Sequence, residues 1–167
     1  VKMADTTTVT KDTVTETMDF KPVKLENYLK IEKSGKLQET SIVSIFNGRN
    51  VELTYNNKKY NYVINRDFII DGNFFMFQVI KSKFKPGFEV VNYIYNPGVE
   101  LETPIKASTK VIGPENVTVD GKEIKLIHIV QSIENIKDNV DLYVDESGVL
   151  QKGIIRMLNL KIELVKK

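Results

Sequence analysis

The sequence lacks cysteine and tryptophan, has a single histidine, His128, and contains no long uninterrupted apolar run. Without cysteine the chain forms no disulfide, thiolate metal site or cysteine nucleophile. One histidine cannot supply a multi-histidine metal site. A transmembrane helix needs about 18 or more consecutive apolar residues, and none is present. These absences exclude several classes of metal, redox and membrane-spanning function.

An excess of charge of one sign is also missing. The 167 residues include 24 basic and 22 acidic side chains, for a net charge of +2. Nucleic-acid binding usually needs a concentrated basic face, so we expect no nucleic-acid partner. Phosphate-binding glycine loops are absent, because Gly72, Gly87 and Gly98 stand alone at turns. No nucleophile, base or metal cluster assembles, so we expect a non-enzymatic domain without a cofactor.

The N-terminal segment is rich in threonine and poor in large apolar residues. We expect residues 1–19 to be partly mobile and residues 20–167 to form a single domain. Position 1 is valine rather than an initiator methionine, and we hypothesise that an export signal or lipid anchor lies upstream. The expected location is therefore the cell envelope, either periplasmic or anchored after export.

Closely spaced turn signals separate short runs of alternating apolar and polar residues. The signals are Ser34-Gly35, Asn47-Gly48, Asn56-Asn57, Asp120-Gly121 and the segment 145–148. Asn-Gly and Asp-Gly pairs accept the positive φ angles that tight β-hairpins require. The pattern predicts a mainly β (α+β) fold, in which a curved antiparallel sheet or half-barrel of about ten strands wraps around one short helix.

The C-terminal segment has two apolar phases. Apolar residues occupy even positions from Leu158 onward but odd positions at Ile155 and Met157. We interpret this as one long strand over residues 154–165, bent by a β-bulge near Met157 and Leu158.

The alternation stops where Phe74, Phe75, Met76 and Phe77 stand in a row. One explanation is a hairpin that turns at Asp71-Gly72. The other is a helix over residues 73–82, with Asp71 or Asn73 as its N-cap and Pro86 preventing its continuation. We favour the helix because the two-residue period is missing. Such a helix would be apolar on nearly all sides, so we expect the curved sheet to enclose it.

Three roles remain open for this apolar stretch: a filled core, the wall of an apolar cavity that holds a lipid or acyl chain, and a surface for a partner. The candidate residues for ligand contact or for plugging the core are Phe74, Phe75, Phe77, Ile80, Tyr93 and Tyr95. Lys81, Lys83 and Lys85 follow the stretch. They are expected to form a solvated face, and a peripheral contact with anionic lipid headgroups is the alternative.

Other polar and aromatic residues have simpler explanations. Tyr60 and Tyr62 share one face of a predicted strand, which suits cross-strand packing, with a sugar-binding stripe as the alternative. His128 lies on the apolar phase of its strand, so we expect a hydrogen-bonded, partly buried ring. Asp145 and Ser147 are expected to shape a turn.

Three stretches resemble parts of exported bacterial domains of unknown function: "FIIDGNFFMFQVI", "VTVDGKEIKLIHIV" and "VDLYVDESGVLQKGIIRMLNLKIELVKK". Those domains are similar in fold to the lipoprotein carriers of the bacterial envelope, LolA and LolB. The resemblance covers roughly residues 20–167 and implies an incomplete β-barrel around an acyl-chain cavity. The arginine that the carriers use in their cavity has no counterpart placed by a motif among Arg49, Arg66 and Arg156.

The resemblance therefore implies a domain that binds a lipid, acyl chain or other apolar ligand in the concavity of a curved sheet. The alternative is an interaction module with a filled core, whose sheet edge or concave face holds another envelope protein.

Overall fold

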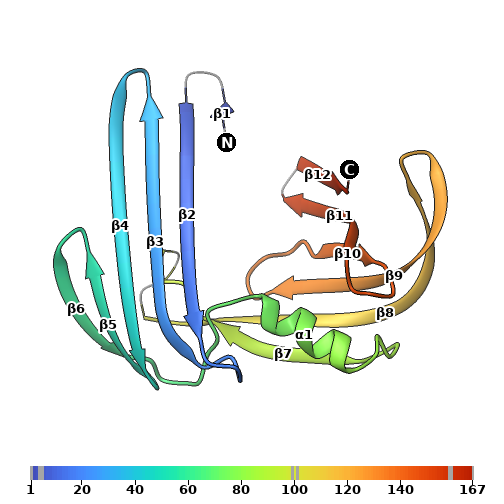
Figure 1. Ribbon diagram of the computed structural model, residues 1–167, viewed down its shortest axis with the longest axis horizontal. Helices are drawn as coiled ribbons and strands as arrows, with labels where there is room; N and C mark the ends of the chain where they lie inside the picture. The colour runs from blue at the N-terminus through green and yellow to red at the C-terminus, as the bar shows by residue number, and fades with distance from the viewer. Residues whose placement is uncertain (1, 4–5, 99, 101, 158–159, 167) are drawn as a thin grey trace. The chain divides into compact units, whose positions relative to one another are not determined.

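The computed structural model describes residues 2–3, 6–98, 100, 102–157 and 160–166 of the chain (Figure 1). The described elements are β1 (Lys2–Met3), β2 (Thr6–Glu16), β3 (Pro22–Lys33), β4 (Lys36–Asn47), β5 (Asn50–Tyr55), β6 (Lys58–Val63), α1 (Asn73–Lys81), β7 (Glu89–Ile94), β8 (Ile105–Val119), β9 (Lys122–Ile133), β10 (Val140–Val144), β11 (Leu150–Met157) and β12 (Leu160–Val165). They group into two compact units. The first is Val1–Asp71 with Ile94–Pro104, and the second is Gly72–Tyr93 with Ile105–Lys167.

The predicted mainly β fold with one short helix is confirmed, but the strands form two antiparallel sheets instead of one. Sheet A has the order β1-β2-β3-β4-β5-β6, and sheet B has the order β12-β11-β10-β9-β8-β7. In both sheets, strands that follow one another in the sequence are neighbours, and neither sheet closes. Figure 1 shows the long strands β2, β3 and β4 side by side, with the shorter β5–β6 hairpin next to β4.

Part of the threonine-rich N-terminal segment is a strand of sheet A. β2 pairs with β3 along its whole length, from Thr6 opposite Lys33 to Glu16 opposite Pro22. Threonine and valine are β-branched, so this composition suits an extended strand. Val9 on β2 is 48% exposed, and most of the strand is open to solvent on both faces.

The predicted hairpin turns are confirmed at three places where the turn residues adopt positive φ. The pairs are Ser34-Gly35, Asn56-Asn57 and Asp120-Gly121. The turn after β4 is shifted by one residue, because Asn47 still pairs with Asn50 and the turn consists of Gly48 and Arg49.

Asp145 shapes the turn between β10 and β11, as the sequence predicts. Its carboxylate accepts hydrogen bonds from the Ser147 hydroxyl and from the backbone N–H groups of Ser147 and Val149, the latter two at 3.0 Å. The Ser147 hydroxyl, followed by the backbone N–H of Val149, lowers the pKa of Asp145 to about 2.

The single long strand expected over residues 154–165 is wrong. β11 ends at Met157, and β12 begins at Leu160 and runs back along it, with Ile155 opposite Ile162. The pairing of β11 with β12 places odd residues of one strand opposite even residues of the other, so this hairpin produces the same phase change as a bulge. Leu158, one of the two residues near which we expected the bulge, lies outside the described residues.

The predicted helix is confirmed as α1, but its predicted cap is wrong. The N-cap residue is Gly72, and no side chain caps the helix. α1 packs on β8 and buries Val79 against Val111, Ile129 and Val144. Among the described residues, no helix has the length and apolar content of a membrane span.

The expectation that the helix is enclosed on nearly all sides is also wrong. Phe75 is buried, whereas the side chains of Phe77 and Ile80 are 49% and 45% exposed. The physical reason is that a sheet lying against a helix covers only the side that it contacts.

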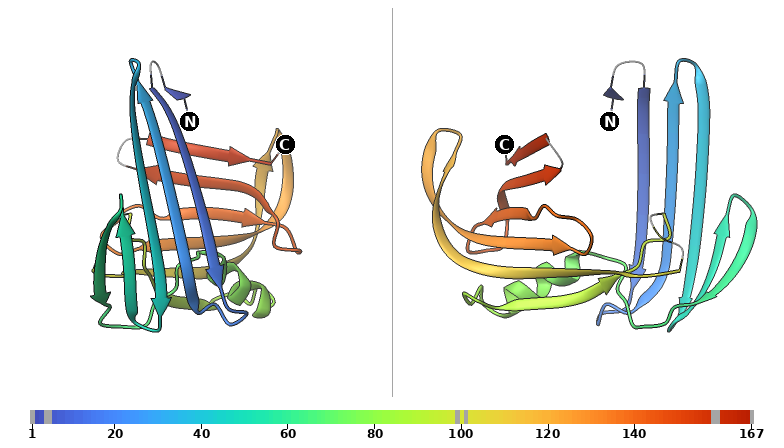
Figure 2. Two further views of the ribbon diagram at one scale, coloured as in Figure 1. Left: turned by 60° about the vertical axis from the view of Figure 1, so that its left-hand side comes forward. Right: turned by 180° about the vertical axis from the view of Figure 1, so that it is seen from behind.

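Sheet B has a buried apolar cluster on each of its faces. A bulge in β8 moves the buried side chains of that strand from one face to the other. Val111 faces α1, and the register shifts between Val111 and Gly113, where φ of +134° favours glycine. Beyond the bulge, Val117 joins a second apolar cluster with Leu126 and Tyr143. Figure 2 shows β8 and β9 bending strongly toward their shared turn.

Candidate functional site

Cross-strand pairing places two rows of side chains on one face of sheet A. Residues directly opposite each other in an antiparallel pair point to the same side of the sheet. The first row is Asp12–Asn27–Ile42–Tyr55, and the second is Val14–Leu25–Ser44–Leu53–Tyr60. This face therefore carries apolar residues in the middle strands, tyrosines toward β6 and polar residues toward β2.

An aromatic cluster covers part of this face. The ring of Phe46 lies 5.6 Å from that of Phe68 and 6.0 Å from that of Tyr95, and the rings of Phe68 and Tyr95 are 5.1 Å apart. The backbone N–H of Tyr95 donates to the carbonyl oxygen of Ile69 at 2.9 Å, which ties the two covering segments together. Burial raises the pKa of Tyr95 to about 12. The three rings are buried, so the cluster covers the part of this face that lies next to Phe46.

Part of the remaining face is an open groove of about 810 Å³. Its floor includes Leu29, Ile42 and Leu53, and the segment Asn96–Gly98 of the same unit borders it. Tyr60 and Tyr62 also line it, with rings stacked at 6.3 Å and an interplanar angle of 13°. Small-molecule sites usually measure roughly 300–1,000 Å³ and are mostly apolar with a few polar groups, which matches this groove.

The end of the groove on β2 and β3 is polar. Asn27 Nδ2 donates to Asp12 Oδ1 at 2.9 Å. Asn27 Oδ1 is buried and has no hydrogen-bond partner among the described residues. Within the same described part of the chain, Asp12 makes no ion pair and is the one charged side chain that lines the groove. The groove thus combines an apolar floor with an acceptor-rich end.

The residues proposed from the sequence lie elsewhere. Phe74 and Phe75 are on α1, with rings 5.6 Å apart and nearly perpendicular, and Phe77 and Ile80 lie on the same helix. Tyr93, on β7, is partly buried. These five residues belong to the second unit, whereas Tyr95 belongs to the aromatic core of the first. The structure does not gather the six into one described site.

The lysines after α1 face solvent. Lys81 ends the helix, and Lys83 and Lys85 are exposed in the turn that follows. Between and after them, Phe84 and Phe88 pack against the apolar cluster on the helix side of sheet B. This arrangement matches the expectation of a solvated face.

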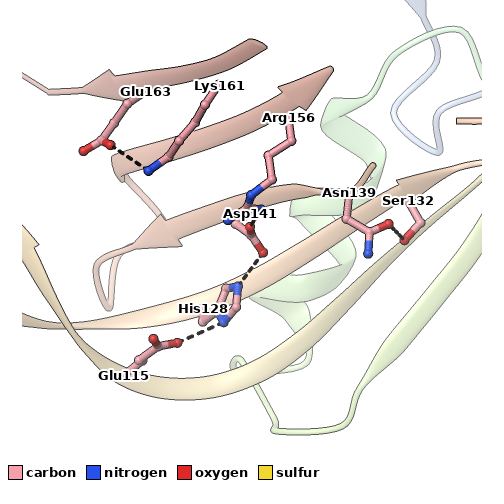
Figure 3. A network of polar contacts seen from close by, with 8 residues as sticks. All are labelled: Glu115, His128, Ser132, Asn139, Asp141, Arg156, Lys161 and Glu163. Carbon is pink, nitrogen blue, oxygen red and sulfur yellow. Dashed lines mark hydrogen bonds and ion pairs between the residues drawn. The ribbon is translucent and has the colours of Figure 1, made fainter. Parts of the chain in front are cut away.

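A chain of ionisable side chains crosses the other face of sheet B (Figure 3). His128 Nδ1 lies 3.0 Å from Glu115 Oε2, and His128 Nε2 lies 3.0 Å from Asp141 Oδ1. Arg156 donates to the second oxygen of Asp141, and the ring of His128 stacks on Tyr143 at 4.6 Å. The prediction of a hydrogen-bonded, partly buried histidine is confirmed, although its partners were not foreseen.

This ladder of Glu115, His128, Asp141 and Arg156 joins four neighbouring strands, β8 to β11. Burial raises the pKa of Asp141, but hydrogen bonds from Arg156 and His128 outweigh burial and hold the pKa below its ordinary value. No group of side chains that could hold a metal occurs in the described part of the chain. Because its ionisable side chains contact one another, the ladder has the arrangement of a structural cross-strand network.

Sequence reasoning missed the groove but identified some of its residues. The shared face of Tyr60 and Tyr62 was predicted from their spacing and is confirmed by their stacked rings. Their connection to Ile42 and Asn27 depends on the pairing of four successive strands, β3 to β6. A systematic alignment of the predicted hairpins, turn by turn, is the signal that could have found it.

No family model matches the sequence, and no curated protein matches it. The fold is similar to a crystal structure described as a beta-barrel-like protein of domain of unknown function DUF1849 from Brucella abortus. The TM-score is 0.65 with 10% sequence identity, and the match covers 95% of this chain and 71% of that chain. At this identity the likeness shows the fold alone, that of a β-barrel-like domain of unknown function.

Proposed function

We propose that this protein is a non-enzymatic binding domain that holds a lipid, an acyl chain or another apolar molecule in the groove of sheet A. The observation that carries the proposal is the groove of about 810 Å³, with its apolar floor and its tyrosines. Removing apolar ligand surface from water supplies about 25 cal/mol per Å², so a chain lying along Ile42 and Leu53 would be held without any covalent step.

The polar groups of the groove support binding over catalysis. Among its described lining residues, Asp12 is the single carboxylate, and neither histidine nor lysine lines the groove beside it. General acid–base chemistry and nucleophilic catalysis both need a paired group within hydrogen-bond reach. Asp12 instead accepts a hydrogen bond from an amide, Asn27, which does not titrate.

The proposed location is the cell envelope, where a periplasmic or anchored domain would meet lipids. This part is supported by the sequence resemblance to exported domains, and Lys81, Lys83 and Lys85 would then meet anionic headgroups. Fractionation of cells that express the complete gene tests the location. Recovery of the unprocessed protein in the cytosol alone would contradict it.

A fluorescent apolar dye, N-phenyl-1-naphthylamine, tests binding directly. We expect saturable uptake by the folded protein and severalfold weaker uptake by Tyr60→Ala, because one contact between aromatic rings contributes about 1 kcal/mol. Phe77→Ala is the matched control, since Phe77 is a comparably exposed aromatic on α1. Absence of uptake would overturn the proposal, and a loss of uptake only in Phe77→Ala would move the site to the helix.

A second candidate function is supported by the edge of sheet A. β1 pairs with Thr6 and Thr7, and within the described residues no strand pairs with the outer side of β2 from Val9 to Thr15. Such an edge can accept an extended segment of another protein through backbone hydrogen bonds. Charges on an edge oppose such pairing, so Val9→Lys would weaken any assembly formed there.

Light scattering tests the simplest form of that interaction, pairing between two copies of the chain. Concentration-dependent dimers that Val9→Lys disrupts would support an interaction module. A monomer at all concentrations that still binds the dye would leave the ligand-binding role in place and argue against pairing of copies.

A further inference from the structure

We infer that the groove of sheet A prefers amphipathic molecules with a cationic, hydrogen-bond-donating headgroup, such as a long-chain amine, over molecules with an anionic headgroup. The inference rests on the proposed function and adds the chemistry and position of the ligand's polar end. It is carried by two neighbouring residues, Asp12 on β2 and Asn27 on β3, which lie directly opposite each other.

The charge of Asp12 is not neutralised on its own face of the sheet. Lys11, Lys24 and Lys30 lie on β2 and β3, but their positions alternate with the groove residues, so they point to the other face. Lys33, Lys36 and Lys58 share the groove face, but Lys58 lies four strand spacings from Asp12, and Lys33 and Lys36 lie six residues along their strands from its row, so each is roughly 19 Å or more away. These separations exceed the Debye length of about 8 Å at physiological salt, so the three lysines neutralise Asp12 very little.

The second observation is the hydrogen bonding of Asn27. Its amide nitrogen is used in donating to Asp12, while its oxygen is buried and lacks a donor among the described residues. A buried acceptor without a partner is unfavourable, and native structures leave few of them. An alkylammonium group brings three N–H donors and a positive charge, whereas a carboxylate brings neither. The polar end of the groove therefore fits a donor, which would contact the exposed carboxylate of Asp12 and would reach Asn27 Oδ1 only after the amide shifts.

The layout of the row fixes the orientation of the ligand. Asp12 and Tyr55 stand three strand spacings apart, about 14 Å, with Ile42 between them. The headgroup would lie at Asp12 and Asn27, and the alkyl chain would cross Ile42 toward the tyrosines. Tyrosine rings suit this end because they offer large apolar faces while their hydroxyl groups stay in water.

Displacement of bound N-phenyl-1-naphthylamine by decylamine, decanol and decanoate tests the inference at pH 7 and low ionic strength, below micelle-forming concentrations. The three probes share one chain and differ in their headgroup. An exposed charge contact contributes up to about fivefold in affinity. The carboxylate of Asp12 attracts decylamine and repels decanoate, and the two effects add in the comparison. We therefore expect decylamine to displace the dye at about tenfold lower concentration than decanoate, with decanol between them.

Asp12→Asn should bring the three displacement curves together. Glu39→Gln is the matched control, because it removes one carboxylate from the opposite face of the same sheet, where Glu39 contacts Tyr28 and Lys30. That variant should keep the preference for the amine. Added salt should weaken the preference in the unmodified protein, which provides a test that needs no substitution.

Equal displacement by all three probes, or stronger displacement by decanoate, would overturn the headgroup preference while the proposed apolar binding stands. Retention of the amine preference in Asp12→Asn would also overturn it. Failure of the protein to take up the dye would instead overturn the proposed function itself.

Discussion

The two sheets have the same strand count and the same neighbour order, but their apolar faces are covered differently. Sheet B carries α1 over one face, and Val79, Val111, Ile129 and Val144 close that contact completely. In the described part of its unit, sheet A carries no helix, and the Phe46, Phe68 and Tyr95 cluster covers only part of its apolar face. The groove lies on the part that remains uncovered. In this protein the segments that cover each sheet, and not the order of its strands, determine whether its apolar face is closed core or open groove.

The polar residues of the two sheets also differ, in how fully they pair with one another. On sheet B, Glu115, His128, Asp141 and Arg156 pair with one another across four strands. On sheet A, the carboxylate of Asp12 contacts the Asn27 amide, whose oxygen has no donor among the described residues. Charges that are already paired stabilise a fold, while unpaired polar groups beside an apolar groove can recognise a ligand.

The largest expected effect comes from opening the covered face of sheet B. Ile129→Ala removes a side chain that is 0% exposed, and we expect a loss of about 2–4 kcal/mol in the free energy of unfolding. Ile42→Ala, on the groove floor of sheet A, should lose less, because Ile42 is 7% exposed and the adjoining groove lets water enter the space that truncation leaves. Urea denaturation of both variants measures the difference. An equal or larger loss for Ile42→Ala would contradict the claim that the apolar face of sheet B is more completely covered than that of sheet A.

A smaller effect is expected from the charged ladder. Asp141→Asn removes the negative charge and replaces one of the two oxygens that accept from His128 and Arg156 by an NH₂ donor, and we expect a loss of about 1–3 kcal/mol. Glu115→Gln should lose less than 1 kcal/mol, since Glu115 is half exposed and exposed pairs contribute little. Thermal unfolding of the two variants tests this order. Unchanged stability in Asp141→Asn would show that the ladder does not hold sheet B together.

The smallest effect concerns the turn held by Asp145. Its pKa in the folded protein, about 2, lies below its ordinary value of 3.8. The stabilisation is therefore present above pH 3.8 and is lost as the pH falls toward 2, because the unfolded chain takes up the proton first. Asp145→Asn should be less stable at neutral pH and should lose less on acidification. Parallel acid-unfolding curves for the variant and the unmodified protein would contradict this.

Local features could be predicted from the sequence because short-range sterics determine them. Asn56, Asn57 and Gly121 adopt the positive φ that their residue types tolerate, so the hairpins were found. The helix was found because four large apolar residues in a row do not fit a strand that has one face in water. The N-cap residue of the helix could not be predicted, because it is Gly72 and no side chain makes a capping hydrogen bond there.

Features that depend on pairing between distant residues could not be predicted. The phase change after Met157 fits both a bulge and a hairpin, and only the pairing of Ile155 with Ile162 decides between them. The division into two sheets and the row from Asp12 to Tyr55 likewise require every intervening register to be known. A slip of one residue in any hairpin would move half of the groove to the other face.

The most direct test of the account is a titration of the labelled protein with decanol, followed through backbone amide chemical shifts in NMR spectra. We predict that the shifts concentrate on the rows of sheet A that include Asn27, Ile42 and Tyr60. Amides of α1 near Phe77 and Ile80 should stay unchanged. Shifts concentrated on α1, with none on sheet A, would contradict the claim that the groove is the binding site.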